Sequence, residues 1–136
     1  MAERLTVGLV GCGRWGRHIL RDLVSLGCDV LVATKSAESR KYASERGASL
    51  IVDEHEQLPE LDGVVVATPT DTHAAVLEAV LERGVPVYSE KPLTCDAESA
   101  ARLASAAPER LFVMDKWRYH PGIERRRKLT LWGSAA

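Results

Sequence analysis

Cysteine is scarce in this sequence, and its spacing excludes two common ways of stabilising a small domain. The three cysteines, Cys12, Cys28 and Cys95, form an odd count without a C-x-x-C pair. A disulfide framework and a structural zinc site both need paired or clustered cysteines. We therefore expect reduced thiols, no metal site and a location in the reducing cytoplasm.

Long apolar runs and charge of one sign are also missing. The apolar stretch near the start is short and interrupted by glycines, so the sequence predicts neither a membrane-spanning helix nor a signal peptide. The net charge of −1 provides no field that would attract nucleic acid or a membrane surface. The basic run at residues 125–128 is interpreted as a solvated helix face, with an anionic partner as the alternative.

What the sequence does contain is the composition of one globular domain. Its 136 residues are 46% hydrophobic and 27% charged, without internal repeats or low-complexity segments. This length suffices for a buried core but is small for an enzyme that holds both a dinucleotide and a separate substrate. We therefore expect one domain, with half of a larger functional unit as an open alternative.

The most informative stretch is 7–20, where an apolar strand pattern runs into a glycine turn and then a helical pattern. Gly11, Gly13 and Gly16 have the spacing G-x-G-x-x-G. In a dinucleotide-binding unit the first glycine permits a tight turn, the second lets a pyrophosphate approach the backbone, and the third lets helix and strand pack closely. The helix N-terminus then offers N–H groups to the phosphates. We therefore predict dinucleotide binding here, and a merely structural turn is the alternative.

Strand and helix patterns alternate along the rest of the chain. Strands are expected at 7–10, 30–33, 50–52, 64–67, 85–88 and 111–114. Helices are expected after the glycine turn as far as Gly27, from the cap Ser36 to about Arg46, from a cap among the hydroxyls and Asp71 of 68–73 to Gly84, and from the cap Thr94 to about Ala107. Residues 53–59 are interpreted as a loop or a short helical turn. This alternation predicts an α/β fold: a doubly wound, Rossmann-like parallel sheet of about six strands with helices on both faces.

Polar residues gather where the expected strands end. They follow the strands as residues 11–16, 34–36, 68–73, 89–92 and 115–120. In an open parallel sheet, ligands bind outside the carboxyl ends of the strands, at the point where the strand order reverses. Lys91, directly after an apolar strand, is expected to polarise a carbonyl or to donate to a nicotinamide ribose. A surface lysine paired with Glu90 is the alternative.

Three motifs, in this order, resemble one known family. The glycine turn, A-T-P-T-D-T-H at 67–73 and S-E-K-P at 89–92 are similar to the N-terminal domain of the Gfo/Idh/MocA oxidoreductases, over roughly residues 4–125. The resemblance implies a dinucleotide-binding domain followed by a second α/β domain that carries most of the substrate site and mediates oligomerisation. That second domain, with its aspartate and histidine acid/base pair, is absent from this sequence.

The resemblance also implies roles for single residues. It places the pyrophosphate beside Gly11, Gly13, Arg14, Trp15 and Gly16, the middle of the cofactor beside Thr68, Pro69 and His73, and the nicotinamide end beside Glu90 and Lys91. Lys91 is then the catalytic residue beside the reacting carbon, and the Lys91-Pro92 bond is expected to be cis. Arg118, in the aromatic-basic segment 117–121, is expected to reach cofactor or substrate.

The same resemblance suggests where the domain ends. We expect the dinucleotide-binding domain to occupy residues 1–121, and residues 122–136 to form the start of a connecting helix and an atypical or truncated tail. The ending at residues 129–136 matches nothing in the family pattern. A naturally shortened, an engineered and a frameshifted terminus are the alternatives.

The end of the second expected strand predicts which dinucleotide is bound. NAD-binding members of this fold place an Asp or Glu about 20 residues after the glycine motif, where it accepts hydrogen bonds from the ribose hydroxyls. Thr34, Lys35 and Ser36 stand there instead, with Arg40 one turn further on. Cations and hydroxyls of this kind can hydrogen-bond a 2′-phosphate. We therefore predict NADP(H) as the cofactor, with NAD(H) as the alternative.

Two functions compete at this point. The first is an NAD(P)-dependent oxidoreductase that transfers a hydride to or from a sugar-like or other small carbonyl or hydroxyl compound and is incomplete for catalysis alone. The second is a non-catalytic nucleotide-binding module or one subunit of a two-chain enzyme. Both predict a dinucleotide ligand, a small-molecule substrate only with a second domain or chain, and association with another copy or another protein.

Overall fold

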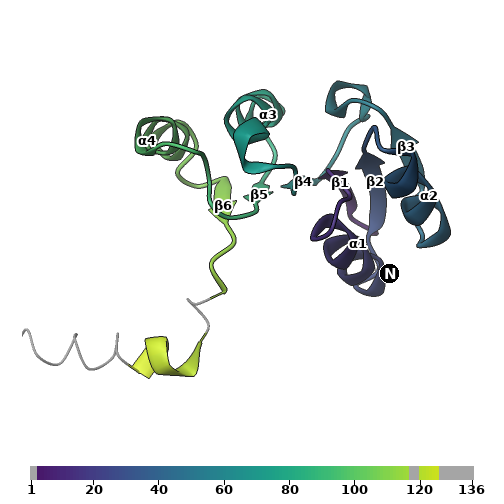
Figure 1. Ribbon diagram of the computed structural model, residues 1–136, viewed down its shortest axis with the longest axis horizontal. Helices are drawn as coiled ribbons and strands as arrows, with labels where there is room; N and C mark the ends of the chain where they lie inside the picture. The colour runs from purple at the N-terminus through teal and green to yellow at the C-terminus, as the bar shows by residue number, and fades with distance from the viewer. Residues whose placement is uncertain (1–2, 117–119, 126–136) are drawn as a thin grey trace, which may run out of the picture.

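The computed structural model describes residues 3–116 and 120–125 (Figure 1). In this part of the chain one sheet contains the strands β1 Thr6–Val10, β2 Asp29–Ala33, β3 Leu50–Val52, β4 Gly63–Val66, β5 Val87–Ser89 and β6 Leu111–Val113. The α-helices are α1 Gly16–Ser25, α2 Ala37–Glu45, α3 His73–Leu81 and α4 Ala97–Ala106. The short 3-10 helices are η1 His55–Gln57 and η2 Thr70–Thr72. The predicted α/β alternation is confirmed.

The sheet is parallel throughout, and its strand order reverses once. The order is β3-β2-β1-β4-β5-β6, and every neighbouring pair is parallel. The chain therefore moves outward from β1 to β3, crosses back, and moves outward again from β4 to β6. The reversal between β1 and β4 is a topological switch point, where a crevice opens at the carboxyl ends of the strands. The predicted doubly wound sheet is thus confirmed.

Helices cover both faces of the sheet because successive strand side chains point to opposite faces. Leu9 of β1 belongs to a buried cluster with Leu20 of α1, and α2 contributes to the same cluster. The next residue, Val10, belongs to a second cluster with Leu77 of α3 and Leu103 of α4. Each fully buried leucine contributes about 1.5–3 kcal/mol relative to exposure. The two clusters therefore fix one pair of helices on each face, as Figure 1 shows.

The start of α4 differs from the sequence prediction. Asp96 is the N-cap, and its side chain accepts a hydrogen bond from Ser99 N at 2.7 Å, which holds the pKa of Asp96 below its usual value. Thr94 is not the cap, because its hydroxyl donates to the carbonyl oxygen of Asp96 at 2.5 Å. The prediction is wrong because the helix begins two residues later, where a carboxylate is available to accept from the first turn.

Other local predictions agree with the structure more closely. Ser36 caps α2 by accepting a hydrogen bond from Ser39 N at 3.4 Å. The segment 53–59 contains the short helical turn η1. Strand β5 begins at Val87 rather than at residue 85, since Pro86 has no N–H group to give to the ladder.

The prediction for the C-terminus lies largely outside the described residues. Residues 121–125 are helical, whereas Arg118 and the expected tail fall outside the described ranges. No helix in the described part of the chain is long and apolar enough to cross a membrane. Over the same residues, no group of His, Cys, Asp and Glu side chains is arranged to hold a metal ion.

Candidate functional site

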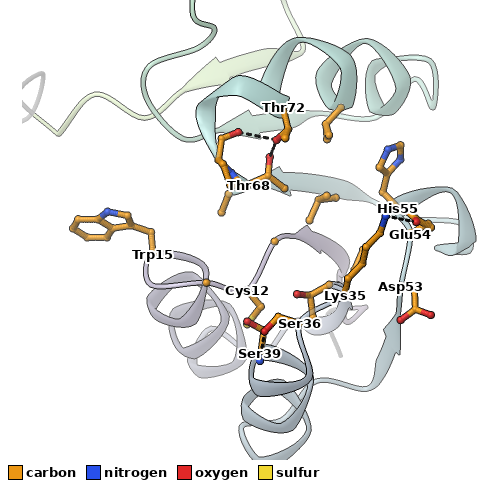
Figure 2. A pocket seen from close by; sticks show the side chains of 18 of the residues that line it. Cys12, Trp15, Lys35, Ser36, Ser39, Asp53, Glu54, His55, Thr68 and Thr72 are labelled. Atoms are coloured by element: carbon orange, nitrogen blue, oxygen red, sulfur yellow. Dashed lines mark hydrogen bonds and ion pairs between the residues drawn. The ribbon is translucent and has the colours of Figure 1, made fainter.

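A cavity of about 590 Å³ lies at the carboxyl ends of β1, β2, β3 and β4. Its walls come from residues 10–15, 33–36, 53–55 and 67–69, together with Ser39, Thr72 and Val76. Figure 2 shows side chains from these segments, which are distant in sequence, around a common space. The switch point of the sheet therefore carries the hollow that its topology predicts.

The three glycines of the turn divide into two roles. A Cβ atom on Gly11 would lie 2.8 Å from the backbone of Ala67, and its φ of +92° disfavours a side chain. A Cβ atom on Gly16 would overlap the carbonyl oxygen of Gly11. A Cβ atom on Gly13 would meet nothing within 4 Å. The fold therefore needs Gly11 and Gly16, whereas Gly13 leaves a bare stretch of backbone in the cavity wall.

Helix α1 begins directly beside this bare backbone. Its first turn contains no acidic side chain, and Trp15 gives it no side-chain cap. Such an N-terminus attracts anions through its N–H groups and a partial charge of about +0.5. Burial raises the pKa of the Cys12 thiol, which therefore stays neutral at pH 7 and adds no negative charge to this wall. Arg14 also lines the cavity, and Trp15 lies at its rim, 56% exposed (Figure 2).

The end of β2 carries the residues predicted to select the cofactor. Residues 34–36 line the cavity, whereas Arg40 does not. Lys35 Nζ lies 2.5 Å from Glu54 Oε1, and this contact raises the pKa of Lys35. Arg40 Nη1 lies 2.6 Å from Asp53 Oδ1. Both cations are thus paired with carboxylates.

Sequence analysis missed Asp53 and Glu54 as candidate site residues. They follow β3 directly, and both line the cavity. The signal that could have found them is the rule used for the other strands, because β3 ends at the same edge of the sheet. Their position in a polar segment favoured the interpretation as an ordinary loop. The neighbouring places of β2 and β3 in the sheet bring them to Lys35.

His73 lies behind the cavity rather than in its wall. The residue is 1% exposed, and it is not among the residues that line the cavity, unlike Thr68 and Pro69. Its Nε2 lies 2.8 Å from the carbonyl oxygen of Thr68, and its Nδ1 lies 2.9 Å from that of Pro92. The cofactor contact of His73 stays a prediction, and the structure shows where the imidazole lies. The imidazole joins the loop after β4 to the loop after β5.

Replacing His73 by leucine is expected to lower the free energy of unfolding by about 2–3 kcal/mol. A neutral imidazole has one N–H group, so the carbonyl oxygen that accepts it, that of Thr68 or that of Pro92, would lose its buried donor, which is costly when no water replaces it. Urea unfolding followed by circular dichroism measures the change. His18→Leu, at an exposed position, is the matched control and should alter stability by less than about 0.5 kcal/mol. Equal effects of both substitutions would contradict the joining role.

The loop after β5 forms part of a second, smaller cavity. Lys91 lines this cavity of about 380 Å³ together with residues 113–116. Glu90 is buried, its Oε2 accepts a hydrogen bond from Lys91 N at 3.3 Å, and its Oε1 has no hydrogen-bond partner among the residues that the structure describes. The ion pairs of the described residues do not include one between these two side chains. The Lys91-Pro92 peptide bond is cis, as predicted.

These features fit a dinucleotide. The bare backbone at Gly13 and the N-terminus of α1 suit a pyrophosphate, and the hydroxyls of Thr34, Ser36 and Thr68 in the cavity wall suit sugar hydroxyls. A buried carboxylate oxygen without a donor, as at Glu90, is costly until a donor reaches it. A ligand hydroxyl or amide at this end of the site would supply that donor.

The sequence of this chain matches one protein family and is similar to dehydrogenases of that family. The Gfo/Idh/MocA family, an oxidoreductase family with an NAD-binding Rossmann fold, matches residues 5–114. The UDP-N-acetylglucosamine 3-dehydrogenase of Acidithiobacillus ferrooxidans is 32% identical over 124 residues, which cover 88% of this chain and 40% of that protein. The inositol 2-dehydrogenase 4 of Saccharopolyspora erythraea is 38% identical over 111 residues, which cover 76% of this chain and 33% of that protein.

A solved structure supports the same fold. Scyllo-inositol dehydrogenase from Lactobacillus casei, with bound NAD(H) and scyllo-inositol, superposes with a TM-score of 0.80 at 20% sequence identity. The match covers 96% of this chain and 42% of that one. The chain thus spans about two fifths or less of the length of these relatives. Because the family match extends over most of its residues, the chain belongs to the Gfo/Idh/MocA oxidoreductases and comprises their NAD-binding Rossmann domain.

Proposed function

We propose that this chain is the cofactor-holding part of an oxidoreductase that moves a hydride between a nicotinamide dinucleotide and a sugar-like or other small hydroxyl or carbonyl compound. The observation that carries the proposal is the bare backbone at Gly13, set beside the N-terminus of α1 at the switch point of the sheet. Relatives named as dehydrogenases of inositol and of UDP-N-acetylglucosamine support a sugar-like substrate.

Each wall of the site has one task in this proposal. Residues 11–16, of which 11–15 line the cavity, bind the pyrophosphate, residues 34–36 hold the adenosine ribose, and Thr68 and Pro69 contact the middle of the cofactor. The bound cofactor supplies or accepts the hydride. Lys91 places its ammonium beside the reacting oxygen, where positive charge stabilises an alkoxide as it develops. The proton that balances the hydride transfer is handled by groups of a second domain or chain.

The second candidate is a non-catalytic nucleotide-binding module or one subunit of a two-chain enzyme. It is favoured by the exposure of Lys91. In both candidates the small-molecule substrate binds only when a second domain or chain closes the site. Association with another copy or another protein is proposed for the same reason, and Phe112 on β6, 53% exposed, supports it.

For the cofactor we propose NADP(H) in preference to NAD(H). The support is the end of β2, where residues 34–36 line the cavity and offer two hydroxyls and one ammonium but no carboxylate. A cytoplasmic location is proposed as well. It is supported by Cys12, Cys28 and Cys95, which are all free.

The 136-residue chain is expected to bind a dinucleotide and to turn over no substrate, because a substrate pocket cannot be closed on one edge of a single sheet. Calorimetric titration with NADPH and NADH measures binding, and oxidation of each in the presence of a panel of sugar and polyol ketones measures turnover. Binding without turnover, with NADPH bound more tightly, is the predicted result. Turnover by the chain would contradict the prediction that it lacks a complete substrate site. Equal or tighter binding of NADH would contradict the proposed cofactor preference. A chain that binds neither dinucleotide would contradict the proposed function itself.

A further inference from the structure

We propose that Glu54, a residue of the loop after β3, determines how strongly this site distinguishes NADP(H) from NAD(H). Its carboxylate lies 2.5 Å from Nζ of Lys35, the cation predicted to receive the 2′-phosphate. This inference rests on the proposed dinucleotide function. It assigns cofactor selection to the end of β3, whereas in this fold selection is normally attributed to the end of β2.

The contact between Lys35 and Glu54 spans the cavity wall between two strand ends. The Nζ atom lies 2.5 Å from Glu54 Oε1, and both side chains line the same cavity (Figure 2). Lys35 is 71% exposed and Glu54 is 49% exposed, so the pair meets solvent and a ligand phosphate can reach it. A phosphate must therefore compete with the carboxylate for the ammonium, whereas a ribose hydroxyl brings no such competition.

The backbone of the loop holds Glu54 at this place. The side-chain Oε1 of Gln57 accepts hydrogen bonds from Asp53 N at 3.1 Å and from Glu54 N at 2.9 Å. Gln57 N in turn donates to the carbonyl oxygen of Glu54 at 3.1 Å. These bonds fix the start of η1 against the end of β3. The main chain at Glu54 is thus held in place beside the cavity.

Arg40, the second cation predicted to bind the 2′-phosphate, is also paired with a carboxylate. Arg40 donates from Nη1 to Asp53 Oδ1 at 2.6 Å and to the carbonyl oxygen of Thr34 at 3.2 Å. Lys35 and Arg40 together carry two positive charges, and Asp53 and Glu54 carry two negative charges. The wall that offers a lysine to a phosphate therefore has no net positive charge. Removing the charge of Glu54 leaves the Lys35 ammonium available to the 2′-phosphate and removes a carboxylate that repels this phosphate.

The test is calorimetric titration of NADP⁺ and NAD⁺ into the full chain, at low ionic strength, for the wild type, Glu54→Gln and Glu56→Gln. Glutamine keeps the shape of Glu54 and its main-chain bonds. We expect E54Q to raise the affinity for NADP⁺ about three- to tenfold and to change the affinity for NAD⁺ less than about twofold. Glu56 is the matched control because it lies in η1, does not line the cavity and acts on Lys35 only at a distance.

A second variant pair tests the route of the effect. If Glu54 acts through Lys35, the gain of E54Q in NADP⁺ affinity should disappear in a Lys35→Gln background. An unchanged ratio of the two affinities in E54Q, an equal gain in E56Q, or a gain that persists without Lys35 overturns the inference. These three outcomes leave dinucleotide binding itself intact. A wild-type chain that binds neither dinucleotide overturns the proposed function, and this inference with it.

Discussion

Replacing Gly13 by valine is expected to weaken dinucleotide binding at least about 100-fold, or by roughly 2.7 kcal/mol, while the fold stays intact. A Cβ atom at this position meets no protein atom within 4 Å, so the chain accommodates a side chain there. The same side chain enters the space that the pyrophosphate needs beside the N-terminus of α1. Calorimetric titration measures the loss of affinity, and circular dichroism with thermal unfolding checks the fold.

Gly63→Val is the matched control for this prediction. Gly63 opens β4 at the amino end of the strand, at the edge of the sheet opposite the cavity. A Cβ atom there comes only to 3.5 Å from the carbonyl oxygen of Pro86, an ordinary contact. Binding should therefore be unchanged in this variant. Wild-type affinity in Gly13→Val would remove the glycine turn from the site.

Gly16→Val is expected to lower the free energy of unfolding by about 3 kcal/mol or more. Dinucleotide binding is then lost because the fold is lost. The new Cβ atom would overlap the carbonyl oxygen of Gly11, and a backbone atom in a tight turn cannot move aside as a flexible side chain can. Helix α1 and strand β1 would then be forced apart at the centre of the sheet. Urea unfolding measures the loss.

Gly13→Val and Gly16→Val are compared directly, because they are expected to differ in stability. Both introduce the same side chain into the same turn, and Gly13→Val is therefore the control for Gly16→Val. A stable, cooperatively folded Gly16→Val variant would contradict the close approach of α1 to the turn. Two variants with the same stability and the same affinity would contradict the division of roles between the glycines.

The parts of the fold that sequence analysis predicted are those with local causes. The run Val64–Val66 is uniformly apolar and β-branched, which is typical of a strand buried on both faces. The glycine spacing predicts the strand, turn and helix at residues 6–25 because each glycine answers a local steric demand. The start of α4 was predicted wrongly, since it depends on one hydrogen bond to the Asp96 side chain, and the start of β5 depends on the missing N–H group of Pro86.

The parts of the site that sequence analysis could not predict depend on contacts between distant segments. Lys35 and Glu54 are brought together only because β2 and β3 are neighbours in the sheet. A lysine in the sequence is available to a phosphate, whereas the same lysine in the structure is already paired. His73 is similar, because its burial depends on carbonyl oxygens of the loops at Thr68 and Pro92, which no residue pattern reveals.

The central claim is that a dinucleotide binds across the carboxyl ends of β1, β2 and β4. The most direct measurement is the change in backbone amide chemical shifts of the ¹⁵N-labelled chain during titration with NADP⁺. We predict the largest changes at residues 11–16, 34–36 and 68, with amides at the amino end of β2, residues 28–29, unmoved. Changes concentrated at that opposite edge, or no changes at saturating dinucleotide, would contradict the account.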